Sequence, residues 1–268
     1  MNPALLAQWQ RLIFPPEPSP VRAGEQLKTG NRYPDVPPGA IDWQAHQDGR
    51  KTYAVNPVYP GPDGGGLCQW GVLDIDEGGD SLNKARALLA LCSVAGLSAR
   101  AAWSGSKGCH VWLFCEPAPV ALVQAVLAKL KAAVPFTGET IPGENQRAKL
   151  PPAFHQERRF WAFWFDTLPD VAPALENAPT GFLDAQTAIL AGVVPTAVPV
   201  LAHYANAGGE RREPEPETDM QPDLGKLAGK IAPCMAALVQ RGAQPALGAW
   251  DKNALTLKRY AVTAGLDD

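Results

Sequence analysis

Two carboxylates stand one residue apart at the end of an apolar stretch. The stretch reads Trp-Gly-Val-Leu-Asp-Ile-Asp-Glu over residues 70–77, and its first two carboxylates are Asp74 and Asp76. In an extended strand alternate side chains share a face, so both acids would point the same way while Ile75 turns into the core. Like charges this close repel unless a cation lies between them, and hard oxygen ligands suit Mg²⁺ or Mn²⁺. A bare pair of this kind is, however, more often two solvated acids at a strand end.

A second motif, flanked by glycines, lies further along the chain. It reads Ser-Gly-Ser-Lys-Gly-Cys-His and spans residues 104–110. Glycine lets the backbone turn tightly enough for several N–H groups to face one anion. The Ser104 hydroxyl, the Lys107 ammonium and the His110 imidazole can point at the same anion, which is what holding a triphosphate requires. Alone, such a loop is usually only a turn, and a histidine at a strand start is more often structural.

A third acidic position, Asp166, ends an apolar segment that is expected to be a strand over 159–166. By itself this acid is most simply a cap at the end of a strand. One edge of a single sheet can bring together the strand ends at 74–76 and 166 and the loop at 104–110. Three carboxylates there would hold the divalent ions that bridge a triphosphate to an attacking hydroxyl, as in two-metal phosphoryl and nucleotidyl transfer.

The elements that must position these residues follow from hydrophobic periodicity and turn signals. The strands at 51–58 and 69–76 are expected to form a hairpin, and 15–47 to be an extended arm or long loop. Two strand–helix–strand passes with hairpins predict an α+β fold with helices on one face of the sheet. Helices are expected at 3–13, 81–95, 119–134 and 184–190, and strands at 51–58, 69–76, 97–103, 111–115 and 159–166.

The sequence divides into three parts. Residues 1–205 form the expected catalytic domain, and the charged, Pro-rich stretch 206–222 is a polar linker with little capacity to pack. Residues 223–268 are expected to be a small C-terminal unit of two helices. Its Cys234 is interpreted as a small buried hydrophobe rather than a cluster ligand.

Composition describes an ordinary globular protein. The chain has 268 residues, 46% hydrophobic residues and a formal net charge of −3, so any phosphate-binding surface must be a local patch. Its five cysteines form no Cys-x-x-Cys pair, and they and the four histidines form no zinc quartet, which predicts reduced, mostly buried thiols. Without a signal peptide or an apolar run long enough to cross a bilayer, the protein is expected to be cytoplasmic, with no membrane partner.

Taken in order, these motifs resemble those of the archaeo-eukaryotic primase superfamily. The matching segments are Val72-Leu-Asp-Ile-Asp76, Ser104-Gly-Ser-Lys-Gly-Cys-His110 and Trp164-Phe-Asp166. Lys149-Leu-Pro-Pro-Ala-Phe-His155 is also similar to a Lys-Leu-Pro stretch in primase-polymerases of mobile elements and of CRISPR-associated or conflict systems. The resemblance covers roughly residues 50–170 and implies an RRM-like mixed or antiparallel sheet with flanking helices, plus the small C-terminal helical unit.

The resemblance also implies roles for individual residues. Asp74, Asp76 and Asp166 would ligate Mg²⁺ or Mn²⁺ and act as the catalytic acids. The phosphates of the incoming nucleotide would be bound by Ser104, Lys107, His110 and Lys149, with Arg147 as a further candidate. The strand at 159–166 is better interpreted as buried on both faces than as a base-stacking platform. Template binding is therefore expected to rest on the N-terminal arm and on Arg158 and Arg159.

The implied function is a template-dependent DNA primase-polymerase that synthesises and extends primers from (d)NTPs. Its expected partners are a single-stranded DNA template, a primer and nucleotides, with a replicative helicase or CRISPR or mobile-element proteins as further candidates. Two alternatives remain open. One is a repair polymerase domain that extends primers without starting them, and the other is a non-catalytic nucleic-acid-binding replication module.

Overall fold

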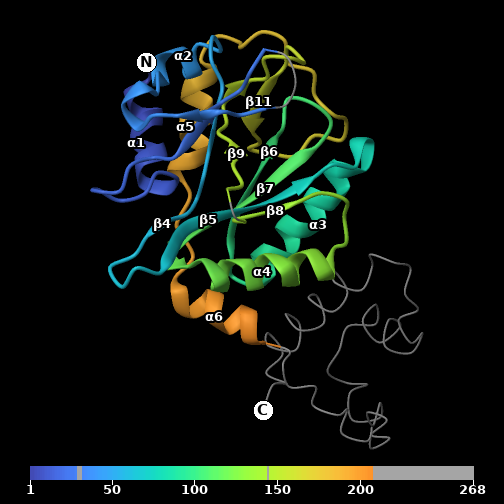
Figure 1. Ribbon diagram of the computed structural model, residues 1–268. Coiled ribbons are helices and arrows are strands. Elements are labelled where there is room, and N and C mark those ends of the chain that lie inside the picture. The colour runs from blue at the N-terminus through green and yellow to red at the C-terminus, as the bar shows by residue number, and fades with distance from the viewer. Residues whose placement is uncertain (29–31, 144, 208–268) are drawn as a thin grey trace, which may run out of the picture. The chain divides into compact units, whose positions relative to one another are not determined.

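The computed structural model describes residues 1–28, 32–143 and 145–207. The expected C-terminal unit at 223–268 and most of the linker before it lie outside these residues. The described chain is a mixed α+β domain built on a seven-stranded antiparallel sheet in the order β10-β11-β6-β7-β5-β4, with β8 beside β5 (Figure 1). Its strands are β4 (Tyr59–Pro60), β5 (Gly66–Ile75), β6 (Ser98–Trp103), β7 (Cys109–Pro119), β8 (Thr140–Ile141), β10 (Ala153–Phe154) and β11 (Trp161–Trp164).

A second sheet, which the sequence did not predict, forms from short strands far apart in the chain. Its order is β2-β1-β3-β9, and its strands are β1 (Ala23–Glu25), β2 (Asp35–Val36), β3 (Tyr53–Val55) and β9 (Ala148–Lys149). The expected hairpin between 51–58 and 69–76 is therefore wrong, because β3 joins this second sheet and the later strand β4 forms the hairpin with β5. The stretch 15–47 is likewise not a plain loop, since it supplies β1, β2 and the whole of a short helix at Trp43–Gln47.

The longer helices lie close to where periodicity places them. In α3 the buried apolar stripe contains Leu82, Ala85, Leu88 and Cys92. The first helix begins with a side-chain cap, because Asn2 Oδ1 accepts a hydrogen bond from the Leu5 N–H. The α-helices are α1 (Pro3–Leu12), α2 (Trp43–Gln47), α3 (Ser81–Val94), α4 (Val120–Ala133), α5 (Phe182–Ala191) and α6 (Val198–Asn206), and short 3₁₀ turns cover Pro38–Ala40 and Gly78–Asp80.

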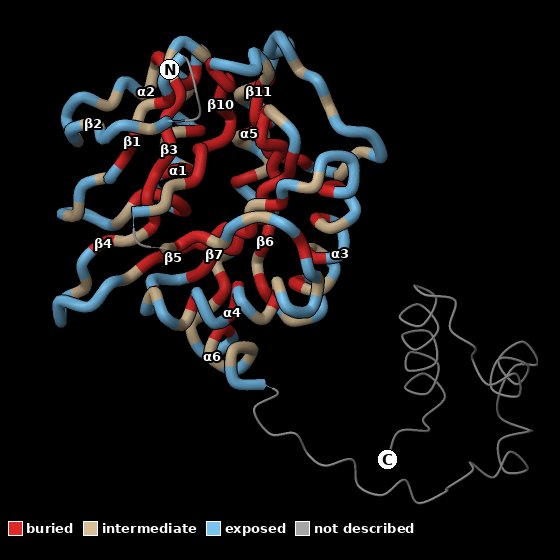
Figure 2. The backbone as a smooth tube through the Cα atoms, turned by 45° about the vertical axis from the view of Figure 1, so that its right-hand side comes forward, coloured by how far each residue is buried: buried red, intermediate tan, exposed pale blue. Residues whose placement is uncertain are grey.

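Both faces of the main sheet are covered, which corrects the expectation of helices on one face. Side chains of one parity on β5, such as Leu73 and Ile75, pack with α3, α4 and α6. Those of the other parity, Trp70 and Val72, pack with α1, α5 and the second sheet. Because β5 is apolar on both faces, each face needs a cover. Figure 2 shows the resulting buried band along β5, β6 and β7.

The four described cysteines are free and buried, in agreement with the thiols expected from the sequence. Burial raises the pKa of Cys68, Cys92 and Cys109 to about 12, so these thiols are poor nucleophiles. Among the described helices, none has the length and apolar character needed to cross a bilayer.

A buried histidine joins the first helices to the second sheet. His46 is fully buried, its Nδ1 accepts a hydrogen bond from the Tyr53 N–H, and its Nε2 donates to the Leu150 carbonyl. Burial lowers the pKa of His46 to about 4, against a weaker opposing effect of the Leu150 carbonyl. The folded protein therefore holds this ring neutral.

The burial of His46 predicts that the folded protein loses stability at acidic pH. Below pH 6.5 the unfolded chain binds a proton at His46 that the folded chain excludes until about pH 4. The free energy of unfolding should therefore fall by up to about 3 kcal/mol across that window. Urea unfolding at several pH values measures it. His46→Asn keeps an acceptor for Tyr53 but cannot titrate, so its profile should be flatter, whereas exposed His203→Asn should match wild type. Parallel wild-type and His46→Asn profiles would contradict this account.

Candidate active site

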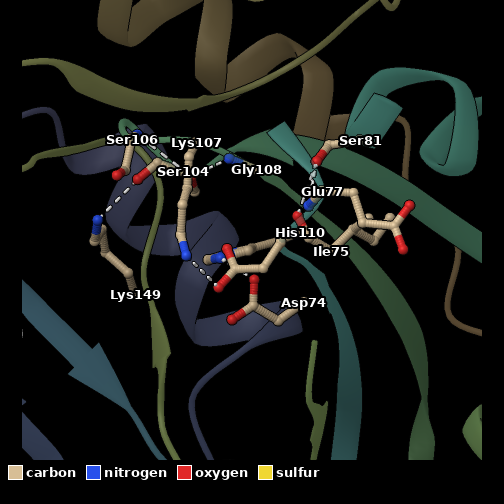
Figure 3. Close-up of polar contacts among 11 residues, drawn as sticks. Asp74, Ile75, Glu77, Ser81, Ser104, Ser106, Lys107, Gly108, His110 and Lys149 are labelled. Atoms are coloured by element: carbon tan, nitrogen blue, oxygen red, sulfur yellow. Dashed lines mark hydrogen bonds and ion pairs between the residues drawn. The ribbon is translucent and has the colours of Figure 1, made fainter. Parts of the chain in front are cut away.

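The paired carboxylates lie at the end of β5, on the face covered by the second sheet. The antiparallel register sets Asp74 directly opposite His110 on β7. The His110 Nε2 lies 3.1 Å from the Asp74 Oδ1 (Figure 3). His110 is buried and Asp74 is half-buried. Burial opposes ionisation of Asp74, but His110, Lys149 and Lys107 together hold its pKa below the usual value. Asp74 is therefore a carboxylate at neutral pH.

The glycine-flanked loop reaches the second carboxylate. The Lys107 Nζ lies 3.1 Å from the Asp76 Oδ2, and this pair is more exposed than the first. Within the loop the Ser104 Oγ accepts hydrogen bonds from the N–H groups of Ser106 and Gly108, at 3.3 and 3.2 Å. From the sequence, backbone amides of this loop are expected to face an anion. These two amides instead donate to a side chain of the loop itself. The hydroxyl proton of Ser104 stays available for donation.

Lys149 comes from β9 of the second sheet and completes the group of cations. It is only 8% exposed, and its Nζ donates a 2.8 Å hydrogen bond to the Ser104 carbonyl. Burial lowers the pKa of Lys149 to about 7, with Asp74 acting in the opposite direction. A buried lysine near a carboxylate can change its protonation when the neighbouring charges change.

One cavity of about 190 Å³ brings these residues together between the two sheets. Tyr33 also faces it, and burial together with the charge of Asp74 raises the pKa of that phenol far above the usual value, so it stays protonated. Six of the seven residues predicted to form the site line this cavity: Asp74, Asp76, Ser104, Lys107, His110 and Lys149. Arg147, Tyr33 and His155 line it with them.

Asp166 is the exception, because the structure does not bring it to this cavity. It lines a separate cavity of about 740 Å³ with residues of α3, β6 and α5. The reason is strand direction. β11 runs antiparallel to β6, and the Phe165 N–H bonds the Ala101 carbonyl, so the chain moves away from the level of Asp74 as it approaches Asp166. The acidic end of this strand therefore lies away from that of β5.

Glu139 is an acid near the site that the sequence reasoning missed. The Asp74 N–H donates a 2.9 Å hydrogen bond to the Glu139 carbonyl, which continues the antiparallel pairing of β8 with β5. Residues directly opposite on antiparallel strands project from the same face, so Glu139 and Asp74 share a face. The exposed Glu139 carboxylate accepts a hydrogen bond from the Gln146 Nε2 at 3.2 Å. The strand that follows Glu139, β8, has only two residues, which are too few to give a periodic pattern in the sequence.

The donor set fits a divalent cation of the hard type. Among the described residues, no three His, Cys, Asp or Glu side chains are clustered closely enough to hold a metal ion on their own. Mg²⁺ nevertheless commonly binds through one or two carboxylates together with water and substrate phosphates. Asp74 and Asp76 supply two such carboxylates at one cavity, and their present partners are the basic side chains of His110 and Lys107.

Two glycines allow the backbone to close around these acids. At Gly138 φ is +139°, and a Cβ there would lie 1.8 Å from the Asp74 carbonyl oxygen. At Gly108 a Cβ would lie 2.1 Å from the Ile75 carbonyl oxygen. Neither position accepts a side chain without moving the end of β5. The glycines thus fix the segments on both sides of the carboxylate strand.

Comparisons with known proteins give a distant likeness. No family model matches the chain, and no curated protein matches its sequence closely enough to count as a relative. Among solved structures, the chain is similar to the polymerase domain from Mycobacterium tuberculosis Ligase D, described in complex with DNA. The TM-score is 0.40 and the sequence identity 19%, covering 67% of this chain and 73% of that chain. Function must therefore be argued from the chemistry of the site.

The close approach at Gly138 predicts a costly substitution. Gly138→Ala should lower the free energy of unfolding by more than about 2 kcal/mol, because the methyl group overlaps the Asp74 carbonyl and φ is unfavourable. Gly79→Ala is the matched control, since a Cβ there meets nothing within 4 Å, and its effect should stay within about 0.5 kcal/mol. Urea unfolding compares the two variants. Equal stabilities would show that the chain at Gly138 adjusts freely.

Proposed function

We propose that this chain is a nucleotidyltransferase of the primase-polymerase type, which joins a 3′-hydroxyl to the α-phosphate of an incoming nucleotide on a DNA template. The observation that carries the proposal is the single cavity between the sheets. It combines two carboxylates of β5 with three basic side chains from three other segments: Lys107, His110 and Lys149. Polyphosphate substrates with divalent cations need both kinds of group within one site.

The carboxylates of Asp74 and Asp76 would hold Mg²⁺ or Mn²⁺. Such ions, when bound, lower the pKa of the attacking hydroxyl and stabilise the pyrophosphate leaving group, so no side-chain general base is required. Asp74 supports this role because it is kept ionised despite burial. A domain without catalysis has no physical need to crowd like charges in this way, which argues against the binding-module alternative.

The basic residues would exchange partners when substrate binds. Lys107 and His110 contact Asp76 and Asp74 in the present structure, each at 3.1 Å. With a divalent cation held by those carboxylates, the two side chains would be free to bind phosphate oxygens. Lys149, held against the Ser104 carbonyl, would stay charged beside a polyphosphate, and the Ser104 hydroxyl has a proton to donate.

The third carboxylate is assigned to Glu139 in place of Asp166. Glu139 directly precedes β8, its backbone pairs with Asp74, and its carboxylate is exposed and therefore able to turn. Asp166 lies in the other cavity and would need β11 to shift relative to β6. Asp74, Asp76 and Glu139 lie at the ends of the neighbouring strands β5 and β8, but Glu139 is not among the residues that line the cavity, so its side chain would have to turn toward it.

The first experiment is a synthesis assay on unprimed single-stranded DNA with Mg²⁺ or Mn²⁺ and labelled NTP or dNTP pools. Products should begin at dinucleotide length. Asp74→Asn/Asp76→Asn should reduce synthesis by about a thousandfold or more, the equivalent of about 4 kcal/mol in the barrier. Asp170→Asn, which alters an almost fully exposed acid, is the control and should remain active.

Other outcomes of the same assay separate the alternatives. Extension of an annealed primer without dinucleotide formation would identify a polymerase that does not start chains. No synthesis with either substrate, while the protein still binds DNA, would favour the non-catalytic module. Near wild-type synthesis by the double variant would exclude the assigned site.

A paired substitution tests the third carboxylate. Glu139→Gln should lower the rate of nucleotide incorporation by about a hundredfold or more, because it removes a charge beside Asp74. Asp166→Asn should change the rate by less than about threefold, since its cavity contains neither β5 carboxylate. Single-turnover incorporation on a primed template measures both. The opposite ranking would restore Asp166 as the ligand and imply that β11 moves on substrate binding.

A further inference from the structure

A rigid turn, residues 155–160, connects β10 to β11 at the wall of the cavity. The His155 N–H donates to the Phe160 carbonyl at 2.8 Å, and the Arg159 N–H donates to the His155 carbonyl at 2.9 Å. The His155 Nδ1 accepts a 3.2 Å hydrogen bond from the Arg158 N–H. Because His155 itself lines the cavity, the turn begins at the site and leads outward from it.

The turn is also anchored to the second sheet. The Gln156 Nε2 donates to the Gly49 and Phe154 carbonyls and to the Thr52 Oγ1. The Gln156 N–H donates to the Gln26 Oε1 at 3.2 Å, just beyond β1. These bonds join three separate stretches of chain, so the position of the turn is fixed before any ligand arrives, which lowers the entropic cost of binding.

Two arginines project from this turn without acidic partners. Arg158 and Arg159 are both exposed, and within the described part of the chain neither has a carboxylate within 4.0 Å. The Arg159 guanidinium lies over the Phe154 ring, 4.6 Å from its centroid, which restrains its direction. Other exposed cations, such as Arg50 and Arg86, pair with aspartates. Arg158 and Arg159 are therefore available to an external anion.

We propose that the 155–160 turn binds the phosphodiester backbone of the nucleic-acid strand that enters the cavity, with Arg158 and Arg159 as the phosphate contacts. This inference rests on the proposed function. The cavity of about 190 Å³ is lined by the groups assigned to the reaction and is too small for more than the reacting groups, so the rest of a polynucleotide must continue over its rim. The turn forms part of that rim through His155. Arg158 lies close to the cavity wall, because its N–H donates a 3.2 Å hydrogen bond to the Nδ1 of His155, which lines the cavity.

Phosphate groups also occur on the free nucleotide, so the test must separate the two sources. Binding of a labelled single-stranded DNA to the full chain is followed by fluorescence anisotropy over a range of KCl concentrations. Arg158→Ala/Arg159→Gln should bind about tenfold more weakly and lower the slope of log K against log salt by about 1.4, or about 0.7 for each lost phosphate contact. Calorimetric binding of a Mn²⁺–dNTP should be unchanged.

Matched variants complete the design. Lys84→Ala/Arg86→Ala removes two positive charges from α3, on the other face of the main sheet, and should leave both affinity and salt slope near wild type. Arg158→Lys, combined with native Arg159, keeps the charge and should retain most of the binding. Thermal melting verifies that each variant is folded.

The outcomes distinguish this inference from the proposed function. Unchanged DNA binding by the Arg158/Arg159 variant, or an equal loss in the Lys84/Arg86 control, would overturn the assignment of the turn while wild-type synthesis still stood. Loss of nucleotide binding with DNA binding intact would move the turn to the triphosphate site. If wild type binds DNA through these arginines but synthesises nothing, the inference holds and the proposed reaction fails.

Discussion

The antiparallel pairing of β5 with β7 is the constraint on which the site depends. It sets Asp74 opposite His110 and extends β5 far enough for Asp76 to emerge on the same face. Two carboxylates on one partly buried face require positive charge nearby, since unit charges a few ångströms apart interact by several kcal/mol at a protein surface. The other elements of the site supply it: Lys107 from the loop after β6 and Lys149 from β9.

The two ion pairs at the carboxylates are unequal, and their burial decides how each can behave. The Lys107 and Asp76 side chains are 66% and 38% exposed, so solvent screens their attraction and the pair contributes little stability. The His110 and Asp74 side chains are 11% and 31% exposed, so their contact is screened less. The lysine can therefore leave its carboxylate easily, whereas the histidine is held in position by the sheet. An exposed lysine beside a buried histidine suits a ligand that enters from the solvent side.

Sequence reasoning succeeded where information is local. Helices α3 and α4 have periodic apolar stripes, and the shared face of Asp74 and Asp76 follows from strand geometry alone. It failed where pairing is long-range. The second sheet joins strands of two or three residues, such as β9 against β3, that no periodic pattern can reveal. Asp166 was misplaced relative to the site because a strand's apolar pattern does not state its direction. Glu139 was missed because only its pairing with Asp74 places it.

The second sheet also explains why the acids and bases of this site depend on one another. Lys149 is buried from β9, and its burial favours the neutral amine while Asp74 favours the ammonium. Asp74 in turn is held ionised by His110, Lys149 and Lys107 against the effect of burial. Removing one member leaves another charge buried without compensation, which costs more than the lost attraction alone. The charges of these residues therefore depend on one another rather than on separate contacts. Because Lys149 is buried where one sheet packs on the other, that packing influences how much positive charge a phosphate substrate meets.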